Sequence, residues 1–229
     1  MNQHWLMKAE PNSRIVKGKE VKFSVEDFEA VGTTPWEGVR NPEARNIMKS
    51  MRLGDKVLFY HSSCKTPGIA GFAEVTREAY PDYTAWDPEH PYYDPKSEER
   101  NPKWFMVDVK FVSRAAHFVP YPLLRKIAAS DATTPPAGLE YIGEKEVSAI
   151  REMDLVHRGR LSVQRVQPEA WEVIEGMAEK GGWTEETKGG GRAKNKEETS
   201  INGKRKNEEG TGTDTDTRRR SKRRTCMKS

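Results

Sequence analysis

The clearest pattern along the chain is an alternation of apolar and polar side chains over residues 104–113. Apolar side chains occupy every second position from Phe105 to Phe111, with Asp108 and Lys110 between them. This period of two predicts a half-buried β-strand. The apolar run within residues 56–61 predicts a second strand. Shorter apolar segments predict further strands at residues 5–8, 69–76 and 161–164.

Helical spacing is clearest after Asn41. Asparagine is a good N-cap and Pro42 suits the first helical position, so a helix is expected to begin here and to end before Gly54. Ser24, followed by acidic residues, is expected to cap a helix of about two turns. The same reasoning predicts helices at residues 121–128, 144–153 and 168–180.

Residues 80–103 contain five prolines and form a long connection between two strands. Connections of that length in a folded domain are usually functional or mobile. The strands come in short pieces with helices between them and without regular βαβ alternation. This order predicts an α+β fold with a curled sheet or a small barrel.

Composition divides the chain after Trp183. Every Trp, Tyr and Phe lies in residues 1–183, whereas residues 184–229 hold 14 Lys and Arg, 8 Asp and Glu, and four hydrophobic residues. A segment so poor in apolar surface cannot repay the entropy of ordering. We therefore expect one folded domain over residues 1–183, with a net charge of −2, and a disordered tail over residues 184–229, with a net charge of +6.

The tail contains two basic clusters separated by eleven residues. The clusters are Lys204, Arg205 and Lys206, and then Arg218, Arg219, Arg220, Lys222, Arg223 and Arg224. This arrangement is typical of a bipartite nuclear localisation signal, and it also attracts nucleic-acid phosphates. A solubilising charged tail is the alternative. We expect a nuclear protein that binds an import receptor through the tail.

Several protein classes are excluded by simple features of the sequence. No apolar run approaches the roughly 18–20 residues that a membrane span needs, and the N-terminus lacks the regions of a signal peptide. The two cysteines, Cys64 and Cys226, are too few for a disulfide scaffold or a four-cysteine zinc site. We expect a reduced intracellular monomer without membrane partners.

Catalytic motifs are missing. Residues 138–143 begin and end with glycine, but Glu144-Lys145 follows and breaks the phosphate-loop pattern. His61 and Cys64 lie three residues apart, yet no third group orients them as a base and nucleophile. We therefore predict that the protein is not an enzyme and uses neither cofactor nor metal.

Aromatic and polar residues gather at the ends of the predicted strands and in the loops. A pocket that accepts a flipped base needs aromatic faces for stacking and a few fixed polar groups for the base edge. The candidates are Lys8, Trp5, Trp36, Arg40, Asn41, Tyr60, His61 and Ser62. Core packing is the alternative for Trp5, but Trp36 lies outside any apolar period. The candidate phosphate contacts are Lys8, Arg40, Arg45 and Lys65.

Five motifs, in order, resemble those of EVE domains. They are Trp5-Leu-Met-Lys-Ala-Glu-Pro11, Trp36-Glu-Gly-Val-Arg-Asn41 with Ala44-Arg45-Asn46, Phe59-Tyr-His-Ser62, Gly68-Ile-Ala-Gly71 and Leu161-Ser-Val-Gln164. Their spacing resembles the thymocyte nuclear protein family in particular, over about residues 4–180. Two departures are Ala9, where the family usually has Ser or Thr, and residues 164–168, which replace the usual Gln-Pro.

The resemblance implies a PUA-like pseudo-barrel of mixed strands surrounded by helices, related to the YTH readers of methylated adenine in RNA. It also implies a reader of modified cytosine in DNA, notably 5-hydroxymethylcytosine, with Trp36 in a pocket wall and Ser62 at the pocket end of its strand. The alternatives are a reader of a modified RNA base and a protein-interaction adaptor that uses residues 80–103.

Deleting residues 184–229 should abolish nuclear accumulation and leave the stability of the domain nearly unchanged, because the tail has no aromatic residue to pack. Microscopy of the tagged chain and thermal unfolding of the purified chain measure the two effects. A large fall in melting temperature after the deletion would show that the tail packs on the domain.

Overall fold

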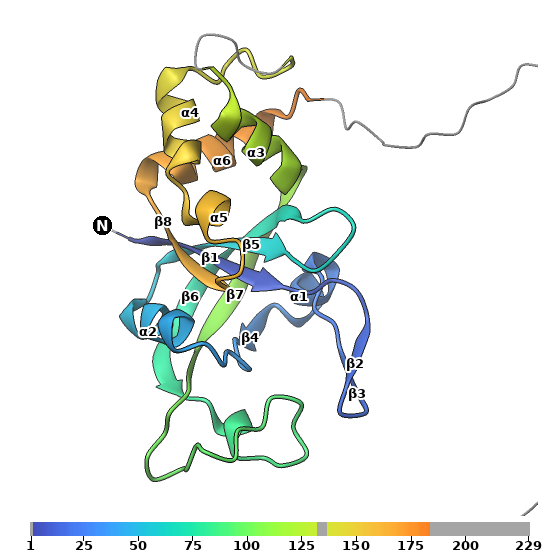
Figure 1. The fold of residues 1–229 in the computed structure, drawn as a ribbon, viewed down its shortest axis with the longest axis vertical. Helices are drawn as coiled ribbons and strands as arrows, with labels where there is room; N and C mark the ends of the chain where they lie inside the picture. Colours follow the sequence, from blue (N-terminus) through green and yellow to red (C-terminus); the bar gives the residue numbers. More distant parts are fainter. Residues whose placement is uncertain (1, 132–136, 184–229) are drawn as a thin grey trace, which may run out of the picture. The chain divides into compact units, whose positions relative to one another are not determined.

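The computed structural model describes residues 2–131 and 137–183, and its centre is a six-stranded mixed sheet (Figure 1). In spatial order the strands are β4 (Thr33–Pro35), β7 (Phe105–Pro120), β6 (Gly68–Pro81), β5 (Lys56–His61), β1 (His4–Ala9) and β8 (Val163–Val166). Strands β1 and β5 run parallel, and the other neighbouring pairs are antiparallel. A separate hairpin joins β2 (Arg14–Val16) to β3 (Lys19–Val21).

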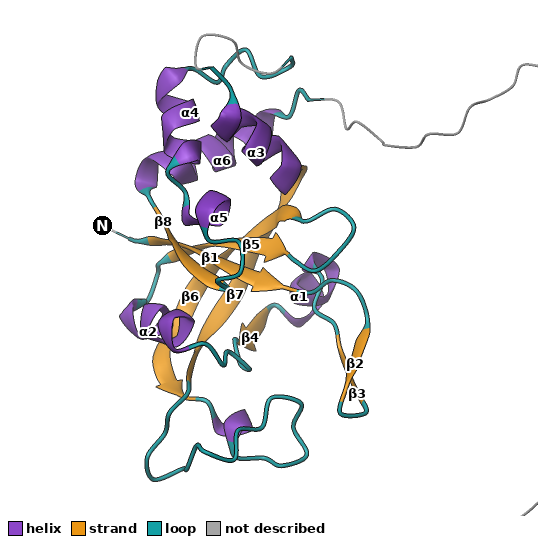
Figure 2. Cartoon of the chain, viewed as in Figure 1, coloured by secondary structure: helices purple, strands orange, loops and turns teal. Residues whose placement is uncertain are grey.

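Helices lie against both faces of the sheet (Figure 2). They are α1 (Val25–Val31), α2 (Pro42–Ser50), α3 (Tyr121–Ala129), α4 (Glu144–Arg151), α5 (Asp154–His157) and α6 (Pro168–Lys180), with a short 3-10 turn at Tyr83–Ala85. Helices α3, α4 and α6 pack on one another at one end of the sheet, where α6 contacts β7. Helix α2 packs against β6, β7 and β8 on the other side.

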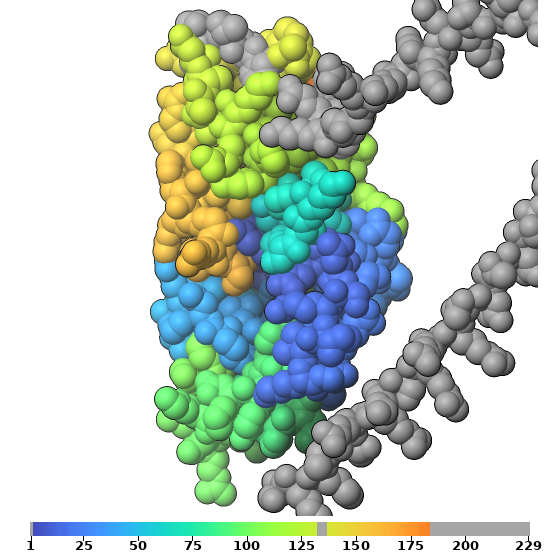
Figure 3. Space-filling view, turned by 45° about the vertical axis from the view of Figure 1, so that its right-hand side comes forward, coloured from blue at the N-terminus to red at the C-terminus, as the bar shows by residue number. Residues whose placement is uncertain are grey.

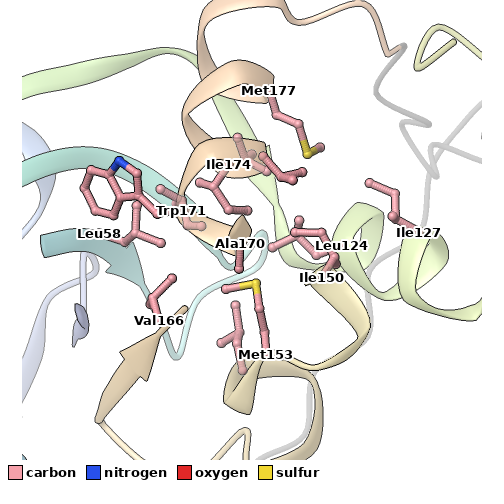
Figure 4. Close-up of a cluster of buried hydrophobic side chains, with 14 of the residues drawn as sticks. Leu58, Leu124, Ile127, Ile150, Met153, Val166, Ala170, Trp171, Ile174 and Met177 are labelled. Atoms are coloured by element: carbon pink, nitrogen blue, oxygen red, sulfur yellow. The ribbon is translucent and has the colours of Figure 1, made fainter. Parts of the chain in front are cut away.

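Two hydrophobic cores result, and β1 and β5 contribute to both. Leu6 and Leu58 belong to the core under α3, α4 and α6, while Trp5, Met7 and Phe59 belong to the core with α1 and α2. Figure 4 shows the first core, where side chains of α6 meet those of α3 and α4. Burial on both faces explains why these two strands are continuous apolar runs without alternation.

The predicted helix starts are formed by the expected caps. The Ser24 hydroxyl accepts a hydrogen bond from the Asp27 backbone N–H, and the Asp27 carboxylate accepts one from the Ser24 backbone N–H. The Asn41 Oδ1 accepts hydrogen bonds from the backbone N–H groups of Glu43 and Ala44. These bonds satisfy donors that a helix otherwise leaves free at its first turn. The α+β fold class is confirmed.

The structure differs from the sequence-based prediction mainly in its edge elements. Residues 33–35 form β4 on the edge of β7, and neither this strand nor the β2–β3 hairpin was predicted. Strand β8 occupies Val163–Val166, two residues beyond the predicted 161–164. Strands β6 and β7 are longer than predicted because their polar, exposed ends are held by cross-strand hydrogen bonds with each other, interrupted by register shifts.

Candidate nucleic-acid interface

A cavity of about 930 Å³ opens where β1, β3 and β4 end near three loops. It is lined by residues 8–10, 19–23, 34–41, 62–63 and 90–92, together with residues 159, 160 and 162. Ligand sites commonly occupy about 300–1,000 Å³, so the cavity is large enough for a nucleotide. Of the predicted base-binding residues, the cavity brings together Lys8, Trp36, Arg40, Asn41 and Ser62.

Trp36 lies directly after β4, and its backbone N–H continues the ladder by donating to the Val107 carbonyl at 2.7 Å. Its ring is edge-on to Phe23 and Phe59, with centroids 6.2 and 6.0 Å away. The residue is 8% exposed and lines the cavity. Trp36 therefore packs in the hydrophobic core through its contacts with Phe23 and Phe59 and also forms part of the cavity wall.

A buried carboxylate holds the segment after Trp36 in place. Asp82 Oδ2 accepts hydrogen bonds from the Gly38 backbone N–H at 2.9 Å and from Arg40 Nη1 at 2.6 Å. Asp82 Oδ1 accepts from the backbone N–H and the hydroxyl of Thr84. Burial raises the pKa of Asp82, but the hydrogen bonds from Thr84, Arg40 and Gly38 outweigh it and bring the pKa below its usual value.

Gly38 also allows the loop of residues 82–104 to approach the cavity. Its φ is +79°, and a Cβ atom at this position would lie 2.5 Å from the Tyr92 ring. Only glycine fits both the backbone conformation and the close contact. Tyr92 and His90 thus line the cavity from this connection between β6 and β7, which is called the proline-rich loop below. His90 Nε2 lies 3.2 Å from Glu37 Oε1.

Arg40 was predicted to contact phosphate, but in the structure its guanidinium is bonded within the Asp82 network. Besides Asp82, its guanidinium donates to the carbonyls of Tyr92 at 2.7 Å and Val39 at 3.3 Å and to the Thr84 hydroxyl at 3.1 Å. The side chain is 19% exposed. A guanidinium with these partners positions the cavity wall and has little capacity left for a phosphate.

Lys8 is the cation at the end of β1. Its Nζ donates to the Gly159 carbonyl at 2.8 Å and lies 5.4 Å from the centre of the Tyr60 ring. Burial lowers the pKa of Lys8 to about 8. The ammonium therefore titrates near physiological pH, unlike a solvated lysine.

Ser62 lies just after β5, beside the end of the parallel strand β1. Its backbone N–H and its hydroxyl both donate to the Ala9 carbonyl, at 2.7 and 3.0 Å. Ala9 itself lines the cavity, at the position where the family resemblance implies Ser or Thr. Asn41 lines the cavity on the opposite segment while its Oδ1 caps α2.

Three predicted base-binding residues lie outside the cavity. Trp5 is fully buried, and its Nε1 donates to Asp55 Oδ2 at 2.8 Å. Tyr60 faces the core under α3 and α6, and burial raises its pKa. His61 Nε2 accepts the Val25 backbone N–H at 3.0 Å, and burial lowers the pKa of His61. The side chains of all three are engaged by other parts of the domain, and none is part of the cavity lining.

The two further phosphate candidates also lie outside the cavity lining. Arg45 Nη1 donates to the Lys103 carbonyl at 2.8 Å, and its guanidinium lies 5.7 Å from the centre of the Trp104 ring. Lys65 is exposed in the loop between β5 and β6. The predicted nuclear localisation residues, 204–206 and 218–224, lie outside the described residues.

Sequence reasoning missed several residues of the site. The cations of the lining are Lys8, Lys19, Lys22, Arg40 and Arg160, and the acids are Glu10, Glu20 and Glu37. Lys8 and Arg40 were predicted; of the others, Lys19 and Glu20 belong to the unpredicted β2–β3 hairpin, Lys22 follows it, and Arg160 lies before β8. The proline-rich loop was the one signal in the sequence that pointed to Tyr92 and His90.

The His61 and Cys64 side chains make separate contacts. Cys64 Sγ donates to the Thr66 carbonyl at 3.3 Å, and burial raises the pKa of this thiol. Over residues 2–131 and 137–183, no group of three or more His, Cys, Asp or Glu side chains is placed to hold a metal ion. None of the helices in these residues is long and apolar enough to span a membrane.

The family model of the EVE domain matches residues 3–177. The chain belongs to the EVE domain family. Thymocyte nuclear protein 1 from Homo sapiens is 44% identical over 183 residues, which are 79% of this chain and 76% of the relative. The protein of that name from Danio rerio is 43% identical over 174 residues, 74% of this chain and 69% of the relative. The resemblance inferred from the motifs is confirmed.

Solved EVE structures share the fold. Human THYN1 protein in complex with DNA containing 5-methylcytosine is 43% identical, with a TM-score of 0.69 over 78% of this chain and 99% of the other. A hypothetical protein from Leishmania major is 40% identical, with a TM-score of 0.63 over 78% of this chain and 96% of the other.

Replacing Arg40 with Ala should destabilise the domain by about 3–5 kcal/mol, because it leaves the fully buried Asp82 carboxylate without its charged partner. Urea unfolding measures the change. Arg114→Ala is a matched control, since Arg114 pairs with Glu26 and Glu29 on the surface and should cost about 0–1 kcal/mol. Equal losses in the two variants would mean that the Asp82 network does not hold the wall.

Proposed function

We propose that this EVE domain is a non-catalytic reader that binds a modified cytosine of DNA, 5-hydroxymethylcytosine or a related base, in the cavity beside Trp36. One observation carries the proposal. An aromatic wall and a half-buried cation, Trp36 and Lys8, line a cavity of about 930 Å³ in a domain whose human relative was crystallised with DNA containing 5-methylcytosine.

In this proposal the base leaves the duplex and stacks on Trp36. Stacking on an aromatic side chain contributes about 1–3 kcal/mol per base, similar to the few kcal/mol that extrusion costs. Net affinity must then come from phosphate contacts. Lys19, Lys22 and Arg160 line the cavity and would take this role in place of Arg40, which belongs to the Asp82 network, and of Arg45, which lies outside the lining. Lys22 also pairs with Asp27 at 3.3 Å.

The base edge would meet the polar groups of the cavity wall, namely Ser62 beside the end of β1, Asn41 on the segment that follows Trp36, and the adjacent backbone. Ala9 leaves this wall without the hydroxyl that the family usually carries. The methyl group offers no hydrogen bond to a hydroxyl substituent, so a preference for 5-hydroxymethylcytosine over 5-methylcytosine would depend on hydrogen bonds from Ser62, Asn41 or the adjacent backbone. A binding panel of cytosine and its 5-methyl and 5-hydroxymethyl forms, in DNA and in RNA, tests the substrate.

The alternatives predict different results in that panel. A reader of a modified RNA base would prefer the RNA series. An adaptor that uses residues 80–103 would bind neither series, and the position of His90 and Tyr92 in the cavity wall argues against it. Release of a base or cleavage of the strand would overturn the proposal that the protein is not an enzyme.

The proposed site of action is the nucleus. Two features support it: the basic clusters in residues 204–224 of the sequence, and relatives that carry the name thymocyte nuclear protein. An import receptor would bind the tail.

Trp36→Leu should weaken binding of modified DNA by about 5- to 150-fold and reduce discrimination against cytosine, because the stacking face is lost. Trp171→Leu is the matched control. Trp171 is buried in the other hydrophobic core and lies outside the cavity lining, so its variant should lose stability and keep discrimination. Fluorescence anisotropy and thermal unfolding measure both. A Trp36→Leu protein that still discriminates would move the base site elsewhere.

Binding should weaken as the pH rises through about 8. The pKa of Lys8 is lowered to about 8 by burial, and a nearby phosphate stabilises only the protonated form. If Lys8 contacts the DNA, affinity should fall by up to about tenfold from pH 7 to pH 9. Lys8→Met should bind more weakly and lose this pH dependence. The same slope in wild type and Lys8→Met would exclude Lys8 from the contact.

A further inference from the structure

The β2–β3 hairpin carries a large apolar side chain in solvent. Ile15 is 65% exposed, one position before the pair Val16 and Lys19 that closes the ladder. Lys17 and Gly18 form the turn with φ values of +50° and +78°. Two successive residues with positive φ make the tight turn that suits a two-residue hairpin. The apolar side chain is therefore presented on a short, well-defined projection.

The hairpin borders the cavity proposed to hold the base. Residues 19–22, which include β3, line that cavity, and Ile15 pairs directly with Glu20. Directly opposed residues of an antiparallel pair point to the same face. The turn meets the proline-rich loop, since Lys17 Nζ lies 5.4 Å from the centre of the Tyr93 ring. In Figure 3 the dark-blue hairpin lies next to this green loop.

The charge around Ile15 suits a polyanion. Residues 14–22 contain four cationic side chains and one acidic side chain. Ile15 leaves most of its apolar surface in water, and it lies among cations at the rim of a cavity large enough for a nucleotide. Proteins that open DNA base steps commonly combine cations with an inserted apolar wedge.

We propose that the hairpin is a wedge for duplex DNA and that Ile15 occupies the gap in the base stack left by the extruded nucleotide. This inference rests on the proposed function. An emptied position exposes the faces of the neighbouring bases to water, and an aliphatic side chain inserted there removes that apolar surface from water. The hairpin cations would hold the phosphates on either side of the gap.

A wedge contributes to binding only when a base has to leave a duplex. Its loss should therefore weaken binding of double-stranded DNA and spare binding of single-stranded DNA, whereas loss of an ordinary contact should weaken both. Ile15→Ala should weaken binding of a duplex with one modified cytosine by about tenfold. It should change binding of the same modified strand, without its complement, by less than about twofold. Ile15→Leu should keep the wild-type affinity for the duplex. Leu53→Ala is the matched control, because Leu53 is 61% exposed and lies outside the cavity lining.

A second readout follows the base directly. With 2-aminopurine placed beside the modified cytosine, wild type should raise the fluorescence of the duplex, and Ile15→Ala should raise it less at saturating protein. Equal losses for duplex and single strand, or no loss for either, would overturn the wedge while leaving the base site intact. If wild type does not distinguish modified from unmodified duplex, the proposed function fails and the wedge fails with it.

Discussion

The two oxygens of Asp82 hold together the segments that shape the cavity. A buried carboxylate is stable only when it is paired and fully hydrogen-bonded, and here Gly38, Arg40 and Thr84 supply those bonds. Because Gly38 lies two residues after Trp36, the same bonds position the aromatic wall against the proline-rich loop. The loop, the wall and the strand β4 are therefore one structural unit, and any change in the ion pair is transmitted to the cavity.

The second constraint is the parallel pairing of β1 with β5. Parallel neighbours bring their carboxyl ends to the same edge of a sheet, so Lys8 and Ala9 come to lie beside Ser62. The cross-strand bonds from Ser62 to the Ala9 carbonyl close this edge. The polar wall of the cavity is thus built from two strands at the centre of the sheet, whereas the aromatic wall comes from its edge.

Local charge, and not the net charge of the domain, decides what the cavity attracts. Residues 1–183 carry a net charge of −2, yet the cavity lining has more cations than acids. The cations that the sequence singled out are largely engaged inside the protein, as Arg40 and Arg45 show. The rim cations Lys19 and Lys22 come from the β2–β3 hairpin and the residue that follows it, and Arg160 comes from the segment before β8; neither segment has a regular apolar pattern.

The sequence by itself determined the central strands, the helix starts at Ser24 and Asn41 and the family, because apolar period, capping chemistry and motif order are local properties of the chain. It also selected Trp36, since no apolar period accounts for that residue. It kept Trp5, which bonds Asp55, as a candidate with core packing as the alternative, because an aromatic residue near a strand end can serve in a core or in a pocket. Only the tertiary structure decided which of them lines the cavity, since that depends on strand pairing and on the buried Asp82 network, whose partners are more than forty residues apart.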